Sequence, residues 1–140
     1  MLTGTVEPND SQTALQAMIY PRHLHDASTT VCALREFFRD DHVHCALIVT
    51  GSQLLALVTR SDVVGADDSD PARAHGTLIG RVVRPDVALE PLRQAMLERG
   101  MRRTAVIAEC GRLMGLLCLK RSGLGFCTEA DIQARANERT

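Results

Sequence analysis

The sequence predicts a mixed α/β (α+β) fold built from two pseudo-symmetric repeats, each a small β-sheet packed by two helices. Three observations carry this prediction. The chain has 140 residues, of which 45% are hydrophobic, which suits one compact domain with a sizeable core. Residues 26–62 align on residues 85–121 without a gap. Within each copy, apolar residues recur first at helical spacing and then in two short continuous runs.

The internal repeat rests on pattern more than on identity. The apolar run 47–49 falls on residues 106–108, and residues 52–58 fall on residues 111–117. A duplicated supersecondary unit explains this agreement more simply than chance does. The identical pairs are Ala46 with Ala105, Leu54 with Leu113, and Leu57 with Leu116.

The first repeat opens with a predicted amphipathic helix over residues 28–40. Ser28 or Thr29 is expected to cap its N-terminus, because a hydroxyl can accept a hydrogen bond from the first free N–H groups. The apolar face is larger than covering one sheet requires, so it predicts a homodimer contact. This face consists of Val31, Leu34, Phe37 and Phe38.

Two strands and a second helix follow. The apolar run 45–49 predicts one strand, residues 50–52 a tight turn, and residues 54–58 the return strand. A second helix is expected to start near Thr59. In the second repeat the same order gives a helix over 88–99, ended by Gly100, and strands over 104–108 and 113–119. The stripe of this helix contains Leu92, Met96 and Leu97.

The expected domain boundaries follow from the repeat. Repeat 1 covers residues 1–68 and includes an N-terminal helix, and repeat 2 covers residues 69–140. A polar linker over residues 65–76 joins the copies. Residues 119–127 look like a strand or loop insertion, and a polar helix over residues 129–138 is expected to end the chain.

Composition excludes several classes of protein. The net charge of −1 and the aromatic content of 3% argue against nucleic-acid binding. No apolar run reaches the length that spans a bilayer, and the N-terminus lacks the features of a signal peptide, so we expect a cytoplasmic protein without a membrane partner. The five cysteines show no C-x-x-C spacing and lie in apolar runs, which is typical of reduced, packed thiols.

The most informative motif is Thr59-x-x-Asp62 at the end of an apolar run. As a capping box, the two side chains would satisfy each other's backbone N–H groups. As a binding site, the Thr59 hydroxyl could donate to a phosphate or ribose oxygen at a helix N-terminus. The Asp62 carboxylate could then accept two ribose hydroxyls. The pattern alone is compatible with both interpretations.

A duplicated helix–strand–strand–helix unit that ends in apolar-x-Thr-x-x-Asp resembles the cystathionine-β-synthase (CBS) domain, and two copies resemble a Bateman module. The resemblance covers about residues 13–132. It implies a non-catalytic regulatory module that binds an adenosyl ligand (AMP, ADP, ATP or S-adenosylmethionine) in a cleft between the repeats and signals to an effector protein. Such modules commonly form homodimers. The alternative is a CBS scaffold that binds no ligand and serves dimerisation or protein interaction.

The resemblance also assigns expected roles to residues. Asp62 would hold the ribose hydroxyls, Thr59 would contact ribose or phosphate, and Arg103 would contact phosphate. Leu24 and His25 would flank the base. Ala46 and Leu47 would line the apolar wall of the site.

The second repeat departs from the family pattern. Cys118 and Arg121 stand where Thr59 and Asp62 stand in the first. Thr128 and Asp131 restore the pattern ten residues later, as a second site or as a helix cap. No metal site, cofactor or catalytic constellation is predicted, and the two His-x-His pairs, which begin at His23 and His42, are interpreted as surface histidines.

Overall fold

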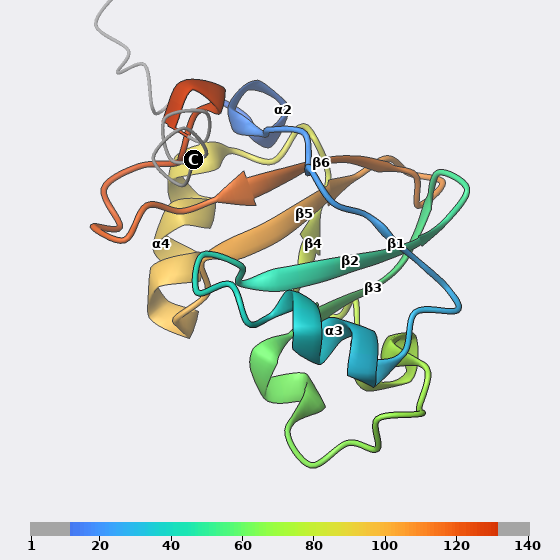
Figure 1. The fold of residues 1–140 in the computed structure, drawn as a ribbon. Coiled ribbons are helices and arrows are strands. Elements are labelled where there is room, and N and C mark those ends of the chain that lie inside the picture. The colour runs from blue at the N-terminus through green and yellow to red at the C-terminus, as the bar shows by residue number, and fades with distance from the viewer. Residues whose placement is uncertain (1–11, 132–140) are drawn as a thin grey trace, which may run out of the picture. The chain divides into compact units, whose positions relative to one another are not determined.

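The computed structural model describes residues 12–131 (Figure 1). Two compact units emerge from its contacts. The first-repeat unit contains residues 21–82 and 107–113. The second-repeat unit contains the described residues up to Tyr20, residues 83–106 and the described residues from Met114 onward. These units divide the chain differently from the sequence repeats, because the N-terminal segment belongs with the second repeat.

The first-repeat unit is a three-stranded sheet in the order β1-β2-β3 with a helix on one face. Strand β1 (His25–Asp26) pairs parallel to β2 (Cys45–Thr50), which forms an antiparallel hairpin with β3 (Gln53–Thr59). Gly51, with φ of 58°, occupies the left-handed conformation in the turn that glycine allows. The predicted strands and turn are therefore present, each strand one to two residues longer than expected.

Helix α3 (Val31–Phe37) is shorter than the helix predicted over 28–40, and its cap is a different residue. The Thr30 hydroxyl accepts a hydrogen bond from the Ala33 N–H at 3.2 Å. Ser28 and Thr29 instead bond to the Asp26 carboxylate, with the Ser28 N–H donating at 3.0 Å. The prediction of Ser28 or Thr29 as the cap was wrong, because this aspartate-centred turn engages both hydroxyls before the helix begins.

The apolar face of α3 packs inside its own unit. Val31 and Leu34 are fully buried and Phe38 is 5% exposed, against the face of the sheet that carries Ala46 and Ile48. Phe37, the fourth residue of this face, is only partly buried. Three of the four residues therefore cover the sheet of their own unit, and the homodimer stays a prediction.

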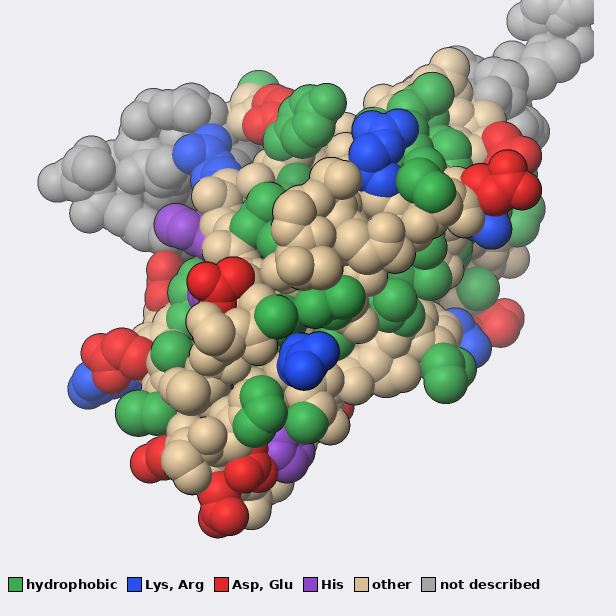
Figure 2. Space-filling model, turned by 90° about the vertical axis from the view of Figure 1, so that its right-hand side faces the viewer, with side chains coloured by type: hydrophobic (Ala, Val, Ile, Leu, Met, Phe, Trp, Pro, Cys, Tyr) green, Lys and Arg blue, Asp and Glu red, His purple; other side chains and the backbone are tan. Residues whose placement is uncertain are grey.

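The chain after β3 forms only a short 3-10 helix, η1 (Arg60–Val63), where a regular helix was expected. Arg35 of α3 holds the loop that follows: its guanidinium donates to the Val63 carbonyl at 2.8 Å and the Ala66 carbonyl at 2.6 Å, and pairs with Asp68. Figure 2 shows acidic side chains grouped at the lower end of the molecule, where this loop lies in Figure 1. The linker also contains a 3-10 helix, η2 (Ala72–His75).

The second-repeat unit repeats the plan. Its sheet has the order β4-β5-β6, formed by β4 (Val82–Val83), β5 (Arg103–Ile107) and β6 (Leu113–Cys118). Helix α4 (Leu89–Arg99) ends at Gly100 in the left-handed conformation, with φ of 69°, as predicted. Residues 120–125 form the tip of a hairpin in the predicted insertion, with the Lys120 N–H donating to the Gly125 carbonyl at 2.8 Å.

The polar helix predicted over residues 129–138 lies, beyond Asp131, outside the described residues. Within residues 12–131, no helix is long and apolar enough to cross a membrane.

The N-terminal segment lies against β6. After the short helix α2 (Ala14–Ala17), Ile19 pairs with Leu116 through two backbone hydrogen bonds of 2.9 and 2.8 Å. A Cβ on Gly115 would come within 2.6 Å of Met18 Sδ and 3.0 Å of the Ile19 carbonyl oxygen. The segment can approach this closely because residue 115 has no side chain.

We therefore expect Gly115→Ala to destabilise the protein by about 1–3 kcal/mol, because the added methyl group would lie only 3.0 Å from a backbone oxygen that is fixed by pairing. Gly125→Ala is the matched control, since nothing lies within 4 Å of a Cβ at that position. Urea unfolding followed by circular dichroism measures both changes. Equal stability of the two variants would contradict the close approach.

Candidate functional site

Thr59 and Asp62 lie where β3 ends and η1 begins. The Thr59 N–H donates to Asp62 Oδ2 at 2.8 Å, and the reciprocal contact from the Asp62 N–H to the Thr59 side chain completes a capping box. The Thr59 and Ser61 hydroxyls are 3.1 Å apart. The capping interpretation of this motif is thus realised. Since η1 has only four residues, the helix dipole invoked for anion binding is weak here.

The structure adds a residue that the sequence did not indicate. Arg81 donates to both carboxylate oxygens of Asp62, at 2.6 and 3.1 Å, and to the Leu57 carbonyl at 2.7 Å. The side chains of Arg81 and Asp62 are only 20% and 17% exposed. Nineteen residues separate the partners and no short motif links them, so only the folded backbone reveals this bidentate pair.

The environment of Asp62 favours its charged form. Burial raises the pKa of this carboxyl, but the hydrogen bonds and charge of Arg81, together with the Thr59 donors, outweigh burial and leave the pKa below its ordinary value. Asp62 is therefore an ionised acceptor, and a ligand hydroxyl would compete with Arg81 for it.

This lowered pKa makes a prediction for stability against pH. A carboxyl whose folded pKa lies below its unfolded value stabilises the fold above the unfolded pKa, near 3.8, and loses this contribution as pH falls through the folded pKa. We expect the stability difference between the wild type and Asp62→Asn to be constant from neutral pH down to about pH 5 and to shrink at lower pH. Urea titrations over this range measure it, and a difference that grows towards acid would contradict the pair.

The four residues expected around the base all lie in the first-repeat unit. His25 pairs with Ile48 across β1 and β2, and its ring lies 4.5 Å from the ring of Phe37, so it shares the α3 side of the sheet with Ala46. Leu47 is the next residue along β2 and points to the opposite face. Ala46 and Leu47 are 1% and 2% exposed, whereas Leu24 is 51% exposed. The structure thus brings His25 and Ala46 to one face and separates Leu47 from them.

His25 has an uncommon environment. Its Nε2 atom is buried and makes no hydrogen bond to any described residue. Burial, followed by the charge of His23, lowers the pKa of His25 despite the opposing effect of Asp26. The neutral imidazole therefore offers an unused hydrogen-bonding atom at the start of β1.

Thr128 and Asp131 have the same local geometry as Thr59 and Asp62. The Thr128 N–H donates to Asp131 Oδ2 at 2.9 Å, and the Asp131 N–H donates to the Thr128 hydroxyl at 3.2 Å. Here a lysine takes the place of Arg81, with Lys120 Nζ 3.8 Å from Asp131 Oδ2. Cys118 is buried in β6 and Arg121 is exposed in the hairpin. Arg103, expected at a phosphate, begins β5 and donates to the Arg102 carbonyl at 3.1 Å.

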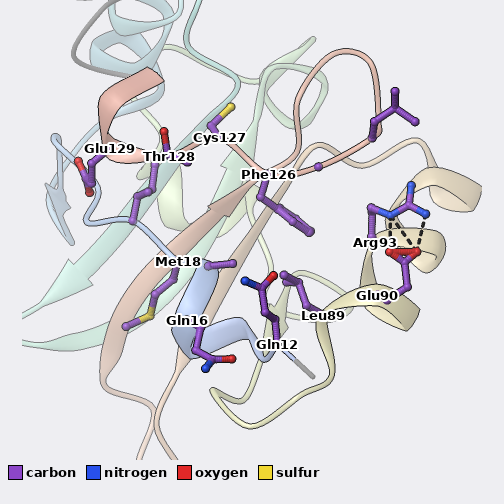
Figure 3. Close-up of a pocket in the computed structure, with 14 residues that line it drawn as sticks. Gln12, Gln16, Met18, Leu89, Glu90, Arg93, Phe126, Cys127, Thr128 and Glu129 are labelled. Carbon is purple, nitrogen blue, oxygen red and sulfur yellow. Dashed lines mark hydrogen bonds and ion pairs between the residues drawn. The ribbon is translucent and has the colours of Figure 1, made fainter. Parts of the chain in front are cut away.

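A cavity of about 390 Å³ lies within the second-repeat unit (Figure 3). Phe126 and Leu89 line it, with Thr128 and Glu129 on one side and the ion pair of Arg93 with Glu90 on the other. Arg93 also donates to the Gly123 carbonyl at 2.7 Å, which ties α4 to the hairpin. Among residues 12–131, no three His, Cys, Asp or Glu side chains are placed to hold a metal ion.

No protein-family model and no curated protein matches the sequence. Solved structures do match. A CBS domain protein from Pyrobaculum aerophilum complexed with AMP has a TM-score of 0.63 at 17% identity, over 89% of this chain and 98% of its own. CBSX2 in complex with AMP has a TM-score of 0.64 at 20% identity, over 93% and 100%. Hypoxic Response Protein I with two coordinated zinc ions has a TM-score of 0.60 at 23% identity, over 88% and 98%.

These likenesses span nearly the whole of both chains, and they agree with the duplicated sheet-and-helix plan of the two units. At identities below 25%, these likenesses show the fold. The chain has the fold of a tandem pair of CBS domains.

Proposed function

We propose that this protein is a non-catalytic regulatory module that binds an adenosyl ligand, such as AMP, ADP, ATP or S-adenosylmethionine, through the first-repeat unit. Asp62 would accept the ribose hydroxyls, Thr59 would contact ribose or phosphate, and His25 with Ala46 would lie against the base. This proposal rests mainly on the ionised, partly exposed carboxylate of Asp62, which lies just after the end of β3.

Two further observations support this proposal. The buried Nε2 of His25 lacks a partner among the described residues, which is costly unless a ligand or water satisfies it. Two of the structures with the same fold hold AMP. Leu24 remains a proposed contact of the same ligand, whereas Leu47 lies on the opposite face of the sheet from His25 and Ala46. In the second-repeat unit, Arg103 remains a proposed phosphate contact and Thr128 with Asp131 a proposed second site.

A thermal-shift panel of AMP, ADP, ATP, S-adenosylmethionine and adenosine tests the proposal. A ligand at 100 times its dissociation constant should add about 2.7 kcal/mol to the stability of the folded state. Guanosine and cytidine monophosphates serve as controls for the base. A panel in which no adenosyl compound shifts the melting temperature would contradict ligand binding.

One observation favours a second candidate, a CBS scaffold that binds no ligand. Arg81 already satisfies both oxygens of Asp62, so the motif is complete without a ribose. In that case Thr59-x-x-Asp62 is a structural cap reinforced by an ion pair, and the module serves protein interaction alone.

The proposal also includes a homodimer and an effector protein that receives the signal. The exposed hydrophobic side chains that could support such contacts are Val64, Ile79 and Leu124, each more than 80% exposed. Light scattering at micromolar protein tests dimerisation, and a monomeric mass would contradict it. Absence of catalysis is tested by following AMP and ATP for turnover with the purified protein.

A further inference from the structure

Two cysteines face each other across the base of the hairpin that interrupts the second repeat. Leu119 pairs with Phe126 in an antiparallel bridge, and the Cys127 N–H donates to the Cys118 carbonyl at 2.7 Å. The Lys120 N–H donates to the Gly125 carbonyl on the other side of this bridge. This register places Cys118 directly opposite Cys127, so their side chains leave the same face of the two strands.

The separation suits a covalent bond. Opposed residues of a hydrogen-bonded antiparallel pair have Cα atoms about 5.5 Å apart, within the roughly 4.4–6.8 Å found for disulfides. Both residues are thiols in the structure, with Cys118 5% and Cys127 3% exposed. Cys127 also lines the cavity of the second-repeat unit, which gives a small oxidant a route to it.

We propose that Cys118 and Cys127 form a reversible disulfide that locks the hairpin at its base. With a peroxide as the oxidant, the Cys127 thiolate attacks one peroxide oxygen, an S–O bond forms, the O–O bond breaks and water leaves. Cys118 then attacks the Cys127 sulfenic acid, an S–S bond forms, the S–O bond breaks and a second water leaves. The two thiols lose two electrons and two protons, which the peroxide takes up.

The bond would act on the cavity wall. The closed ring would contain the hairpin that supplies Leu124, Gly125 and Phe126 to the cavity, and it would end one residue before the Thr128 cap. Reduction by a dithiol would release it. The oxidation state of the pair would therefore set how freely this wall and the Thr128 cap move.

The test uses the full chain with Cys32→Ala and Cys110→Ala, which removes the two exposed cysteines and leaves three of the five. The protein is treated with hydrogen peroxide, quenched, unfolded and alkylated with N-ethylmaleimide. We expect one alkylated cysteine, Cys45, a Cys118–Cys127 peptide link by mass spectrometry, and a melting temperature higher by roughly 3–10 °C that dithiothreitol reverses.

Two matched variants sharpen the result. Adding Cys118→Ala should leave a Cys127 sulfenic acid that dimedone labels, and adding Cys127→Ala should leave both remaining thiols alkylated. Three alkylated cysteines after peroxide treatment, a link through Cys45, or irreversible over-oxidation of Cys127 would each overturn the proposal. Nucleotide binding plays no part in these readouts, so the proposal stands or falls independently of the proposed function.

Discussion

Asp62→Ala is expected to weaken the binding of adenosine and AMP by about ten- to a hundredfold. Hydrogen bonds from ribose hydroxyls to a charged acceptor contribute roughly 1.5–3 kcal/mol, which corresponds to this range of affinity. Isothermal titration calorimetry on the wild type and the variant measures it, with circular dichroism to confirm that the fold is retained.

The controls separate binding from capping. Under the capping interpretation, Asp62→Ala removes the cap, worth about 1 kcal/mol of stability, together with the ion pair to Arg81, and leaves the affinity for ligand unchanged. Arg121→Ala changes the residue that stands at the corresponding repeat position, and it should leave ribose recognition intact, since a guanidinium cannot accept hydrogen bonds from hydroxyls. Unchanged affinity in Asp62→Ala would reduce the motif to a cap and favour the scaffold without a ligand.

The repeat explains why the fold was predictable from the sequence. The strand pair 45–49 and 54–58 and the helix over 88–99 were recognisable because each hydrophobic pattern occurs twice and ends in turn residues such as Gly51 and Gly100. The ends of helices were harder to predict where neighbouring side chains compete for the capping hydrogen bonds. Helix α3 starts late because Asp26 engages two hydroxyls, which no periodicity shows.

The candidate site was predictable only in part. The motif Thr59-x-x-Asp62 is local, so its geometry follows from four consecutive positions. The pairing of Arg81 with Asp62 depends on tertiary structure, because it is set by where the chain returns after the linker. The separation of Ala46 from Leu47 depends on which face of β2 packs under α3. The sequence did contain a signal for this separation, because neighbouring residues of a strand point to opposite faces.

Arg81→Ala separates the two candidate functions most sharply. Removing the guanidinium leaves a carboxylate that is 17% exposed without its bidentate partner, so we expect a loss of about 2–3 kcal/mol in the free energy of unfolding. If Asp62 binds ribose, the same change removes the competitor, and adenosine should bind up to about tenfold more tightly even though the protein is less stable.

Opposite signs for stability and affinity cannot come from general damage to the fold, which lowers both. Arg73→Ala is the control, because Arg73 is an exposed arginine in the same unit and its removal should change neither stability nor affinity.

The double variant Asp62→Ala/Arg81→Ala completes a thermodynamic cycle. A coupling of about 1–3 kcal/mol in stability establishes the ion pair. The gain in adenosine affinity must then vanish when Asp62 is absent. A gain that persists without Asp62 would place the ribose elsewhere, and no gain in the single variant would identify the pair as a purely structural lock.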